Sequence, residues 1–303
     1  YADPVRMGVK DVLDQAAIAG IRVMLITGDY PQTAKFVMGQ IGLPVTDEDI
    51  LLGENIVSLS LPELALKLKN IKLLARTSPD QKLKIVTALN QSGEVVAMMG
   101  DGVNDAPALH EADIGIVVAQ ASDVARESAD LVLLDSNFST VLAAIEEGRA
   151  IFDNIRKVIL YLLCDAFEEI VVIVGSLLLR IPIPIAAVQI LWINLFSDGF
   201  PNLALTVDPK RPGVMQEHPR LPSERLVNAW MVKIIAVTSV LYGLLTLLIL
   251  WRVYASTGDV VFVQSVAYIT LGINTSFYVF SFKNLWSPIW KSHLFDNPWL
   301  NVS

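Results

Sequence analysis

The hydrophobic residues of this chain are concentrated in its second half, and this uneven distribution constrains the fold more than any other feature. They make up 53% of the 303 residues. Up to about Asp153 they alternate with charged residues, as in a water-soluble domain. From Val158 onward the apolar runs approach the ~20 residues that a helix needs to cross a bilayer. We therefore predict a soluble part over residues 1–153 and a transmembrane part over residues 154–303.

Charge and cysteine content narrow the possible partners. The formal net charge of −8 argues against nucleic-acid binding, which requires a basic face. Cys164 is the single cysteine, so no disulfide can form within the chain. The chain opens on Tyr1 with neither an initiator methionine nor a signal peptide, and we expect it to be a piece of a longer polypeptide.

Short apolar runs alternate with helically spaced segments throughout the soluble part. The predicted strands cover residues 21–26, 71–76, 94–99, 113–118 and 130–134. Helices are predicted over residues 11–19, 31–41 and 122–128, with a further one starting near Pro79. This alternation predicts an α/β fold with a doubly wound parallel sheet and helices on both of its faces. Such sheets bind ligands at the carboxyl ends of their strands.

Acidic side chains follow the predicted strand at residues 94–99. The run from Met98 to Leu109, MMGDGVNDAPAL, places Asp101, Asn104 and Asp105 on one short loop. Their hard oxygen atoms suit Mg²⁺ that bridges to a phosphate. Each fragment alone, Gly-Asp-Gly or Asn-Asp, is also an ordinary turn sequence.

Two further segments carry groups that could contact phosphate. Thr27-Gly28-Asp29 follows a predicted strand, so the threonine hydroxyl could donate to a phosphate oxygen, while Asp29 could cap the next helix or contact a nucleotide. Lys82 lies in the first turn of a helix, where a cation opposes the helix dipole, and this predicts an anionic centre nearby. We expect Thr27, Lys82 and Asp101 to converge at one edge of the sheet.

The complete run from Met98 to Leu109 closely resembles the hinge motif of P-type cation-transporting ATPases, the membrane branch of the haloacid-dehalogenase superfamily. Thr27, Lys82 and Asp101 match that superfamily's second, third and fourth motifs in order. The resemblance implies that the threonine holds a phosphoryl group and that the lysine neutralises it. It also implies that Asp101 and Asp105 bind Mg²⁺. The implied catalytic residues are Thr27, Gly28, Asp29, Lys82, Asp101, Asn104 and Asp105.

Other signatures of this family do not occur in the sequence. Neither Asp-Lys-Thr-Gly-Thr, whose aspartate is phosphorylated, nor the Thr-Gly-Glu of the actuator domain is present. The resemblance implies that the actuator domain, the nucleotide-binding domain that holds most of the ATP and the first four membrane helices lie outside this chain. The chain alone is then expected to be inactive.

The transmembrane part is predicted to contain about four spans, at residues 158–179, 185–205, 228–254 and 260–282. Neither proline nor glycine occurs between Gly148 and Gly175, which predicts one continuous helix of about 60 Å that enters the bilayer from the soluble part. The basic loop from Asp208 to Val227 is typical of a cytoplasmic side, so we expect an integral, multi-pass protein whose soluble part is cytoplasmic.

Acidic residues interrupt the first predicted span. An ionisable group inside a span costs about 2.5–3.5 kcal/mol on insertion scales, so such groups usually have a function unless the helix is hydrated there. The next span contains further oxygen-bearing side chains, and Gly199 and Pro201 favour local unwinding that would free backbone carbonyls. Together these oxygen-bearing side chains predict a binding site for a hard cation. The candidate ligands are Asp165, Glu168, Glu169, Asn194, Ser197 and Asp198.

These positions resemble the cation ligands of calcium pumps of the sarco/endoplasmic-reticulum type, which would fall on Glu169, Asn194, Ser197 and Asp198. Ala166 stands where that family has an asparagine, and no glutamate follows Ala255, so Asp165 or Glu168 are candidates for a rebuilt site. The implied function is part of an ATP-driven Ca²⁺ pump. A pump for Na⁺, K⁺, H⁺ or Mn²⁺, a non-catalytic membrane-bound regulatory module and a tethered phosphatase remain as alternatives.

Overall fold

The computed structural model describes residues 8–135, 137–221, 223–283, 285 and 296–302. The chain divides into two compact units, one formed by Tyr1–Glu146 with Gly213–Ser223 and the other by Glu147–Pro212 with Glu224–Ser303. The segment Gly213–Ser223 therefore belongs to the first unit, although it lies between two helices of the second unit in the sequence. Each unit is described separately below.

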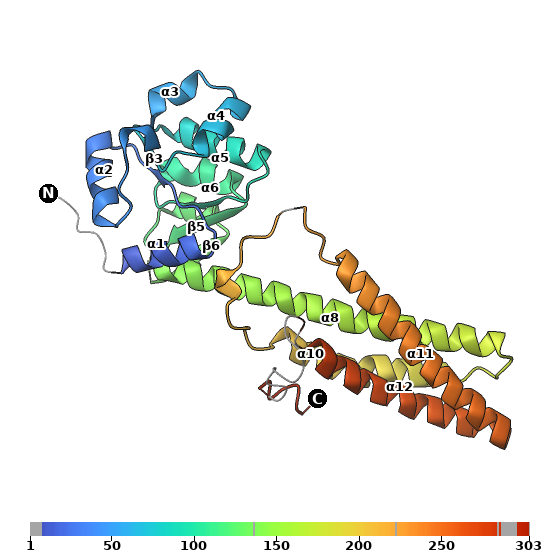
Figure 1. Ribbon diagram of the computed structural model, residues 1–303. Coiled ribbons are helices and arrows are strands. Elements are labelled where there is room, and N and C mark those ends of the chain that lie inside the picture. Colours follow the sequence, from blue (N-terminus) through green and yellow to red (C-terminus); the bar gives the residue numbers. More distant parts are fainter. Residues whose placement is uncertain (1–7, 136, 222, 284, 286–295, 303) are drawn as a thin grey trace. The chain divides into compact units, whose positions relative to one another are not determined.

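The first unit is built from short strands connected by helices (Figure 1). Its strands are β1 (Leu25–Ile26), β2 (Ile50–Leu52), β3 (Leu73–Ala75), β4 (Ala97–Met99), β5 (Ile114–Val118) and β6 (Leu131–Leu133). Its α-helices are α1 (Val9–Ile18), α2 (Pro31–Gln40), α3 (Gly53–Val57), α4 (Leu61–Leu68), α5 (Pro79–Gln91), α6 (Ala106–Glu111) and α7 (Asp123–Glu127). Short 3₁₀ turns are η1 (Asp47–Asp49), η2 (Val103–Asp105) and η4 (Val214–Gln216).

All strand pairs are parallel, which confirms the predicted fold class. The strands form two three-stranded sheets, in the orders β1-β3-β2 and β4-β5-β6, so the expectation of one continuous sheet is wrong for the described residues. β1 and β4 are end strands and are not hydrogen-bonded to each other. Ile26 and Val96 nevertheless pack against the same two hydrophobic clusters, so the sheets share one core.

The observed strands are shorter than the predicted ones. β1 covers Leu25–Ile26 instead of residues 21–26, and β4 covers Ala97–Met99 instead of residues 94–99. Each of these two strands pairs on one side only, so the flanking apolar residues have no backbone partner with which to extend the ladder. The helical predictions are confirmed more closely, because capping residues mark their ends; Ser78, for example, accepts a hydrogen bond from the Gln81 backbone at the start of α5.

The second unit is helical, and its helices pack around two hydrophobic clusters. α8 (Phe138–Leu178) is a single helix of 41 residues, about 60 Å long, which confirms the predicted continuity across the junction of the two parts. α11 (Ala229–Thr257) and α12 (Val260–Phe282) are the two described helices that are long and apolar enough to cross a membrane. The apolar stretch of α8 contains the three acids Asp165, Glu168 and Glu169.

The region predicted as the second span, residues 185–205, is not one regular helix. It consists of α9 (Ala187–Trp192), the π-helical turn η3 (Ile193–Ser197) and α10 (Gly199–Thr206). The backbone N–H of Asp198 donates to the carbonyl of Ile193 at 3.0 Å, five residues earlier. The predicted irregularity is therefore present, but it lies just before Gly199 and takes the form of a π turn, a feature often found at functional sites.

Helices α8 and α11 approach each other closely at two glycines. A methyl group on Gly243 would lie 2.6 Å from Cγ1 of Val171, and one on Gly175 would collide with Leu247. The absence of a side chain at these positions lets the two helix backbones come together, as at many contacts between membrane helices.

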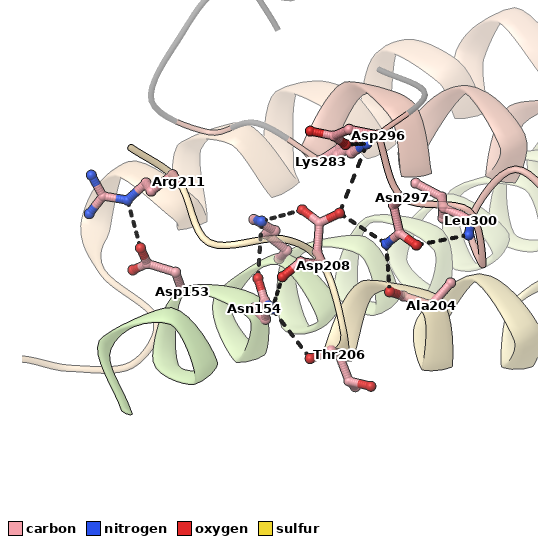
Figure 2. A network of polar contacts seen from close by, with 11 residues as sticks. Asp153, Asn154, Ala204, Thr206, Asp208, Arg211, Lys283, Asp296, Asn297 and Leu300 are labelled. Atoms are coloured by element: carbon pink, nitrogen blue, oxygen red, sulfur yellow. Dashed lines mark hydrogen bonds and ion pairs between the residues drawn. The ribbon is translucent and has the colours of Figure 1, made fainter. Parts of the chain in front are cut away.

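The end of α10 is anchored by a buried polar network (Figure 2). Asp208, just beyond α10, forms a 2.6 Å ion pair with Lys157 of α8 and accepts a 3.0 Å hydrogen bond from Asn297. Asn297 also donates to the Ala204 carbonyl at 2.8 Å, and Lys283 lies 4.0 Å from the Asp208 carboxylate. The network thus ties α8, α10, the end of α12 and the segment near Asn297 together around one carboxylate.

We expect Gly243→Ala to lower the free energy of unfolding by about 1–3 kcal/mol, because the new methyl group would overlap Val171 and push α8 and α11 apart. Thermal unfolding in mild detergent measures this. Gly272→Ala in α12 is the matched control, because a methyl group there has no described atom within 4 Å. Equal losses for the two variants would contradict the close packing at Gly243.

We expect Lys157→Met to lower the free energy of unfolding by about 3–5 kcal/mol, because it leaves the buried Asp208 carboxylate without its closest cation. Adding Asp208→Asn removes that uncompensated charge and should recover part of the loss. Denaturant titration of the two single variants and the double variant gives the coupling between the residues. Strictly additive losses would show that the ion pair is not a stabilising unit.

Candidate functional site

The loop that follows β1 is fastened to the loop that follows β3. The backbone N–H of Thr77 donates to the Thr27 carbonyl at 3.1 Å, and the Thr77 hydroxyl donates to the same carbonyl at 2.9 Å. The Asp29 carbonyl accepts from the Arg76 backbone at 3.1 Å. The Thr27 hydroxyl accepts from the Asp29 N–H at 3.1 Å, which turns the chain sharply after the strand. These contacts hold the predicted phosphate-binding threonine in one orientation.

Asp29 does not cap the following helix. The N-cap residue of α2 is Tyr30, which makes no side-chain capping bond. The alternative that Asp29 serves as a helix cap is therefore wrong, because the helix begins one residue too late for its side chain to serve. Its possible contact with a nucleotide is discussed below as part of the proposal.

Lys82 has the anionic neighbour that its position predicted. Its ammonium group lies 2.6 Å from Oδ1 of Asp105, and both side chains are largely buried, with 16% and 11% of their surfaces exposed. Asp105 closes the 3₁₀ turn η2, and its Oδ2 accepts a long 3.4 Å bond from the Gly102 N–H. The third and fourth sequence motifs are thus in direct contact.

The start of α5 joins the two groups of contacts. Thr77 immediately precedes the N-cap of α5, and Lys82 lies in its first turn. Thr77 holds the Thr27 loop while Lys82 binds Asp105, so a single helix end connects three sequence motifs.

Asp101 and Asn104 are exposed, and neither side chain makes a hydrogen bond or ion pair with the residues that the structure describes. The carboxylates of Asp101 and Asp105 are hard oxygen donors of the type that Mg²⁺ prefers, and Mg²⁺ is commonly held by one or two carboxylates with water and phosphate. In chemical type, these residues fit the ion. No group of three or more His, Cys, Asp or Glu side chains among the described residues is arranged to hold a metal.

Gly100 allows the strand end to approach Asp105. A methyl group at Gly100 would lie 2.6 Å from the Cβ of Asp105 and 2.8 Å from its Oδ2. At Gly102 the nearest atom would be 3.7 Å away, which is an ordinary contact. The first glycine of Gly-Asp-Gly is therefore required by packing against the carboxylate that binds Lys82.

In the second unit, two acids from different helices face each other. The carboxyl group of Asp165 on α8 is hydrogen-bonded to that of Asp198, next to the π turn. The Tyr161 hydroxyl donates to Oδ1 of Asp198 at 2.9 Å. An ionised carboxylate can only accept, so this pair requires a proton or a cation between the two groups.

Glu169 lies near this pair in the sequence and has an oxygen without a partner. Its Oε1 is buried and makes no hydrogen bond with the described residues. Ser197 is partly buried, whereas Asn194 is exposed. In the π turn, the Asp198 N–H bonds to the carbonyl of Ile193 instead of that of Asn194, so Ile193 lies one turn before Asp198 on the buried face. Asn194 is displaced from that face.

Glu168 has different surroundings from the other acids. Both of its carboxylate oxygens are hydrogen-bonded to side chains of α11 and α12, namely Thr246, Asn274 and Tyr278. The structure thus separates Glu168 from the Asp165–Asp198 pair, although the sequence offered both acids as candidates to rebuild a cation site.

Sequence reasoning missed several residues that organise these sites. Tyr161 lies one helical turn before Asp165, as Asp165 lies one turn before Glu169, and this spacing could have identified it. Thr77 follows a predicted strand end and could have been grouped with Thr27. No local signal points to Asn297 or Asp208, whose contact joins residues 89 positions apart.

Both parts of the chain match known protein families. Residues 182–303 match the family "Cation transporting ATPase, C-terminus". Residues 1–113 and 82–145 match two families described as haloacid dehalogenase-like hydrolases.

Several relatives align over most of the chain. The "Calcium-transporting ATPase 1" of Bacillus cereus is 37% identical, over 99% of this chain and 36% of the relative. The "Calcium-transporting ATPase" of Bacillus subtilis is 38% identical, over 98% of this chain and 34% of the relative. The "Endoplasmic reticulum calcium ATPase srcA" of Aspergillus fumigatus is 43% identical, over 76% of this chain and 24% of the relative.

The chain thus spans about a third or less of the length of the curated relatives it matches. The family matches join a haloacid dehalogenase-like part to the C-terminal part of a cation pump, in the order that the two observed units have along the chain. The chain belongs to the P-type cation-transporting ATPases of the haloacid-dehalogenase superfamily, and among them it is most similar to the calcium-transporting branch.

Proposed function

We propose that this chain is part of an ATP-driven pump that moves Ca²⁺ across a membrane. The observation that carries the proposal is the presence of two distinct sites on one chain. One is a lysine–aspartate pair on the loops that follow parallel strands, and the other is a group of buried acids on apolar helices. The names of the relatives favour calcium over other cations.

In this proposal the first unit handles the phosphoryl group. An aspartate outside this sequence is phosphorylated from ATP, the Thr27 hydroxyl donates to the phosphoryl oxygens, and Lys82 balances their charge. Gly28 and Asp29 lie on the same loop as Thr27, and Asn104 lies on the same loop as Asp101. Asp101 and Asp105 would hold Mg²⁺, which would supply positive charge to the phosphate oxygens when bound.

The unpaired strand edges support a place for the missing aspartate. β1 pairs only with β3 and β4 only with β5 among the described residues, so each has a free edge. Val95, two residues before β4, and Met99, its last residue, are 60% and 37% exposed although they are apolar. We propose that the strand of the Asp-Lys-Thr-Gly-Thr motif pairs with both edges, which would bring its aspartate between the Thr27 loop and the Asp101 loop.

The buried acids of the second unit are proposed as the cation site. Asp198 and Asp165 are almost fully buried, at 2% and 3% exposure, and Glu169 contributes the unpartnered oxygen. A divalent cation among these oxygens would replace the proton that the Asp165–Asp198 pair otherwise requires. Ser197 and Asn194 complete the proposed set of cation ligands. Ala166 stands where related calcium pumps have an asparagine, and the carboxylate of Asp165 would supply the oxygen that alanine lacks.

The continuity of α8 supports a route of communication between the two sites. The helix begins at Phe138, directly after the sheet of β4, β5 and β6 in the sequence, and it carries Asp165 and Glu169. In this proposal, a displacement of its N-terminal end is transmitted to the acids along one continuous helix.

We also propose that the first unit is cytoplasmic. The segment Gly213–Ser223, which belongs to the first unit, lies within the connection from α10 to α11 in the sequence. The basic residues of this connection, Lys210, Arg211, Arg220 and Arg225, favour the cytoplasmic side of a membrane.

Gly100→Ala should lower phosphorylation of the full-length protein from ATP by about 10- to 100-fold, because the methyl group displaces Asp105 from Lys82. Gly102→Ala is the matched control two residues away and should have little effect, since its methyl group makes only an ordinary contact. Thermal unfolding of both variants checks that the loss is local. Equal activity of the two variants would contradict the role of the Lys82–Asp105 contact.

The proposed function is tested by ion-dependent phosphorylation of the full-length protein from ATP, with Ca²⁺, Mn²⁺, Na⁺, K⁺ and H⁺ screened separately. Micromolar Ca²⁺ should produce the phosphorylated protein, and Glu169→Gln and Asp198→Asn should abolish that response because each removes a charged ligand. Asp101→Asn should remove phosphorylation with every ion. Activation by another ion alone would overturn the assignment of calcium, and no response to any ion would favour a non-catalytic module.

A further inference from the structure

The side-chain oxygen of Asn202, on α10, is buried and accepts no hydrogen bond from the described residues. Two other buried side-chain oxygens in the described part of the chain share this property, Oδ1 of Asn90 and Oε1 of Glu169. Asn90 lies in the first unit, where its amide nitrogen donates to the Glu111 carbonyl at 2.8 Å. Asn202 and Glu169 both belong to the second unit. A buried acceptor without a donor is costly, and such atoms commonly contact a bound ion or water.

Asn202 lies one helical turn after Asp198. Its backbone N–H donates to the Asp198 carbonyl at 3.0 Å, so regular α-helical geometry is restored after the π turn. Side chains four residues apart on a helix are neighbours, and the Cα–Cβ bond of each is tilted toward the N-terminal end of the helix. The side chain of Asn202 is therefore tilted toward the turn that carries the Asp198 carboxylate. Pro201 and Leu205, on the same side of α10, are also buried.

The proposed cation site needs neutral oxygen ligands in addition to its acids. Ca²⁺ takes about six to eight oxygen ligands, and protein sites combine carboxylates with the carbonyl oxygens of the backbone, Asn or Gln. Asn194, which the sequence suggested for this role, is exposed, and Ala166 has no side-chain oxygen. Asn202 carries the buried amide oxygen on this part of the chain. It would add a ligand without adding negative charge to the nearby carboxyl groups.

The hydroxyl group that contacts the same turn is already engaged. Tyr161 of α8 donates to Oδ1 of Asp198 at 2.9 Å and lies 3.4 Å from the Ser197 carbonyl. A tyrosine has a single hydroxyl hydrogen, so Tyr161 cannot satisfy Asn202 as well. The described residues thus supply no donor to Oδ1 of Asn202, whereas a cation can bind such an oxygen directly.

We propose that Asn202 is a further ligand of the transported cation, with its Oδ1 binding a divalent ion that Asp198 and Glu169 also bind. In this arrangement Asp198 supplies charge, and Asn202 supplies a neutral oxygen one turn further along the same helix. The inference rests on the proposed function, because it adds a residue to the cation site of that function.

The ligand is tested by equilibrium binding of radioactive Ca²⁺ to the full-length protein in mild detergent, without ATP. Asn202→Leu retains the branched shape of the side chain and removes its oxygen. It should weaken Ca²⁺ binding by about 10-fold or more, the loss that follows removal of even an outer-shell partner of a metal site. Unchanged binding by Asn202→Leu would overturn the proposal.

Thr206→Val is the matched control on the same helix. It also removes one side-chain oxygen, but the Thr206 hydroxyl is exposed and donates to the Leu203 carbonyl of its own helix. Ca²⁺ binding by Thr206→Val should equal that of the wild type. Equal weakening in Thr206→Val and Asn202→Leu would show that any change in α10 disturbs binding, and it would overturn the specific role of Asn202.

Thermal unfolding with and without Ca²⁺ distinguishes a ligand from a structural residue. Without Ca²⁺, Asn202→Leu should unfold at the same temperature as the wild type or at a higher one, because an apolar group replaces a buried oxygen that has no partner. The rise in unfolding temperature on adding Ca²⁺ should be smaller than in the wild type, because ligand binding stabilises the folded state according to its affinity. A lower unfolding temperature without Ca²⁺ and an unchanged rise with Ca²⁺ would identify Asn202 as a structural residue and overturn the proposal.

Asn202→Asp provides a second variant that retains an oxygen at the same position. Its carboxylate can bind the cation, so Ca²⁺ binding should be stronger than in Asn202→Leu. Equal losses of binding in two folded variants, Asn202→Asp and Asn202→Leu, would show that the oxygen itself is not what matters and would overturn its assignment as a ligand.

The binding measurement also separates this inference from the pump assignment. Ca²⁺ binding that depends on Asn202 in a protein that ATP does not phosphorylate would support the ligand, while the pump function fails. Ca²⁺-dependent phosphorylation together with normal Ca²⁺ binding in Asn202→Leu would support the pump and overturn the ligand. A wild type that binds no Ca²⁺ would overturn both the assignment of calcium and the role of Asn202.

Discussion

Burial of carboxylates among apolar helices is the constraint on which the second unit depends. A carboxylate removed from water is costly unless donors, a proton or a cation satisfy its oxygens. Asp198 and Asp165 meet this requirement by facing each other beside Tyr161, and Glu168 meets it through side chains of α11 and α12. The helices must therefore pack so that these groups meet, and close contacts such as that at Gly243 make the packing possible.

The same requirement explains the network at the end of α10. Asp208 is buried, and it is satisfied by Lys157, Asn297 and the more distant Lys283. The carboxylate therefore anchors the far end of the helix that carries the π turn and Asp198. A carboxylate at each end defines the position of this short helix within the bundle.

In the first unit, the organising element is the start of α5. Its preceding residue Thr77 holds the Thr27 loop, and its first turn presents Lys82 to Asp105. A lysine near a helix N-terminus is unfavourable by itself, and here the buried carboxylate of Asp105 compensates its charge. The helix α8 is the direct connection between the two units along the chain, and its 41 residues form an uninterrupted helix.

The sequence by itself determined the parallel α/β class, the ends of several helices, the continuity of α8 and the motif residues, because these depend on local spacing, capping residues and short signatures. Tertiary structure alone decided the division into two sheets, the π turn that leaves Asn194 exposed, and the partners of each buried acid. Asp165 and Glu168 illustrate the difference, since both carry a carboxyl group and they are only three residues apart. Their surroundings differ because they point to different neighbouring helices, and contacts over 33 or 110 positions leave no trace in local sequence.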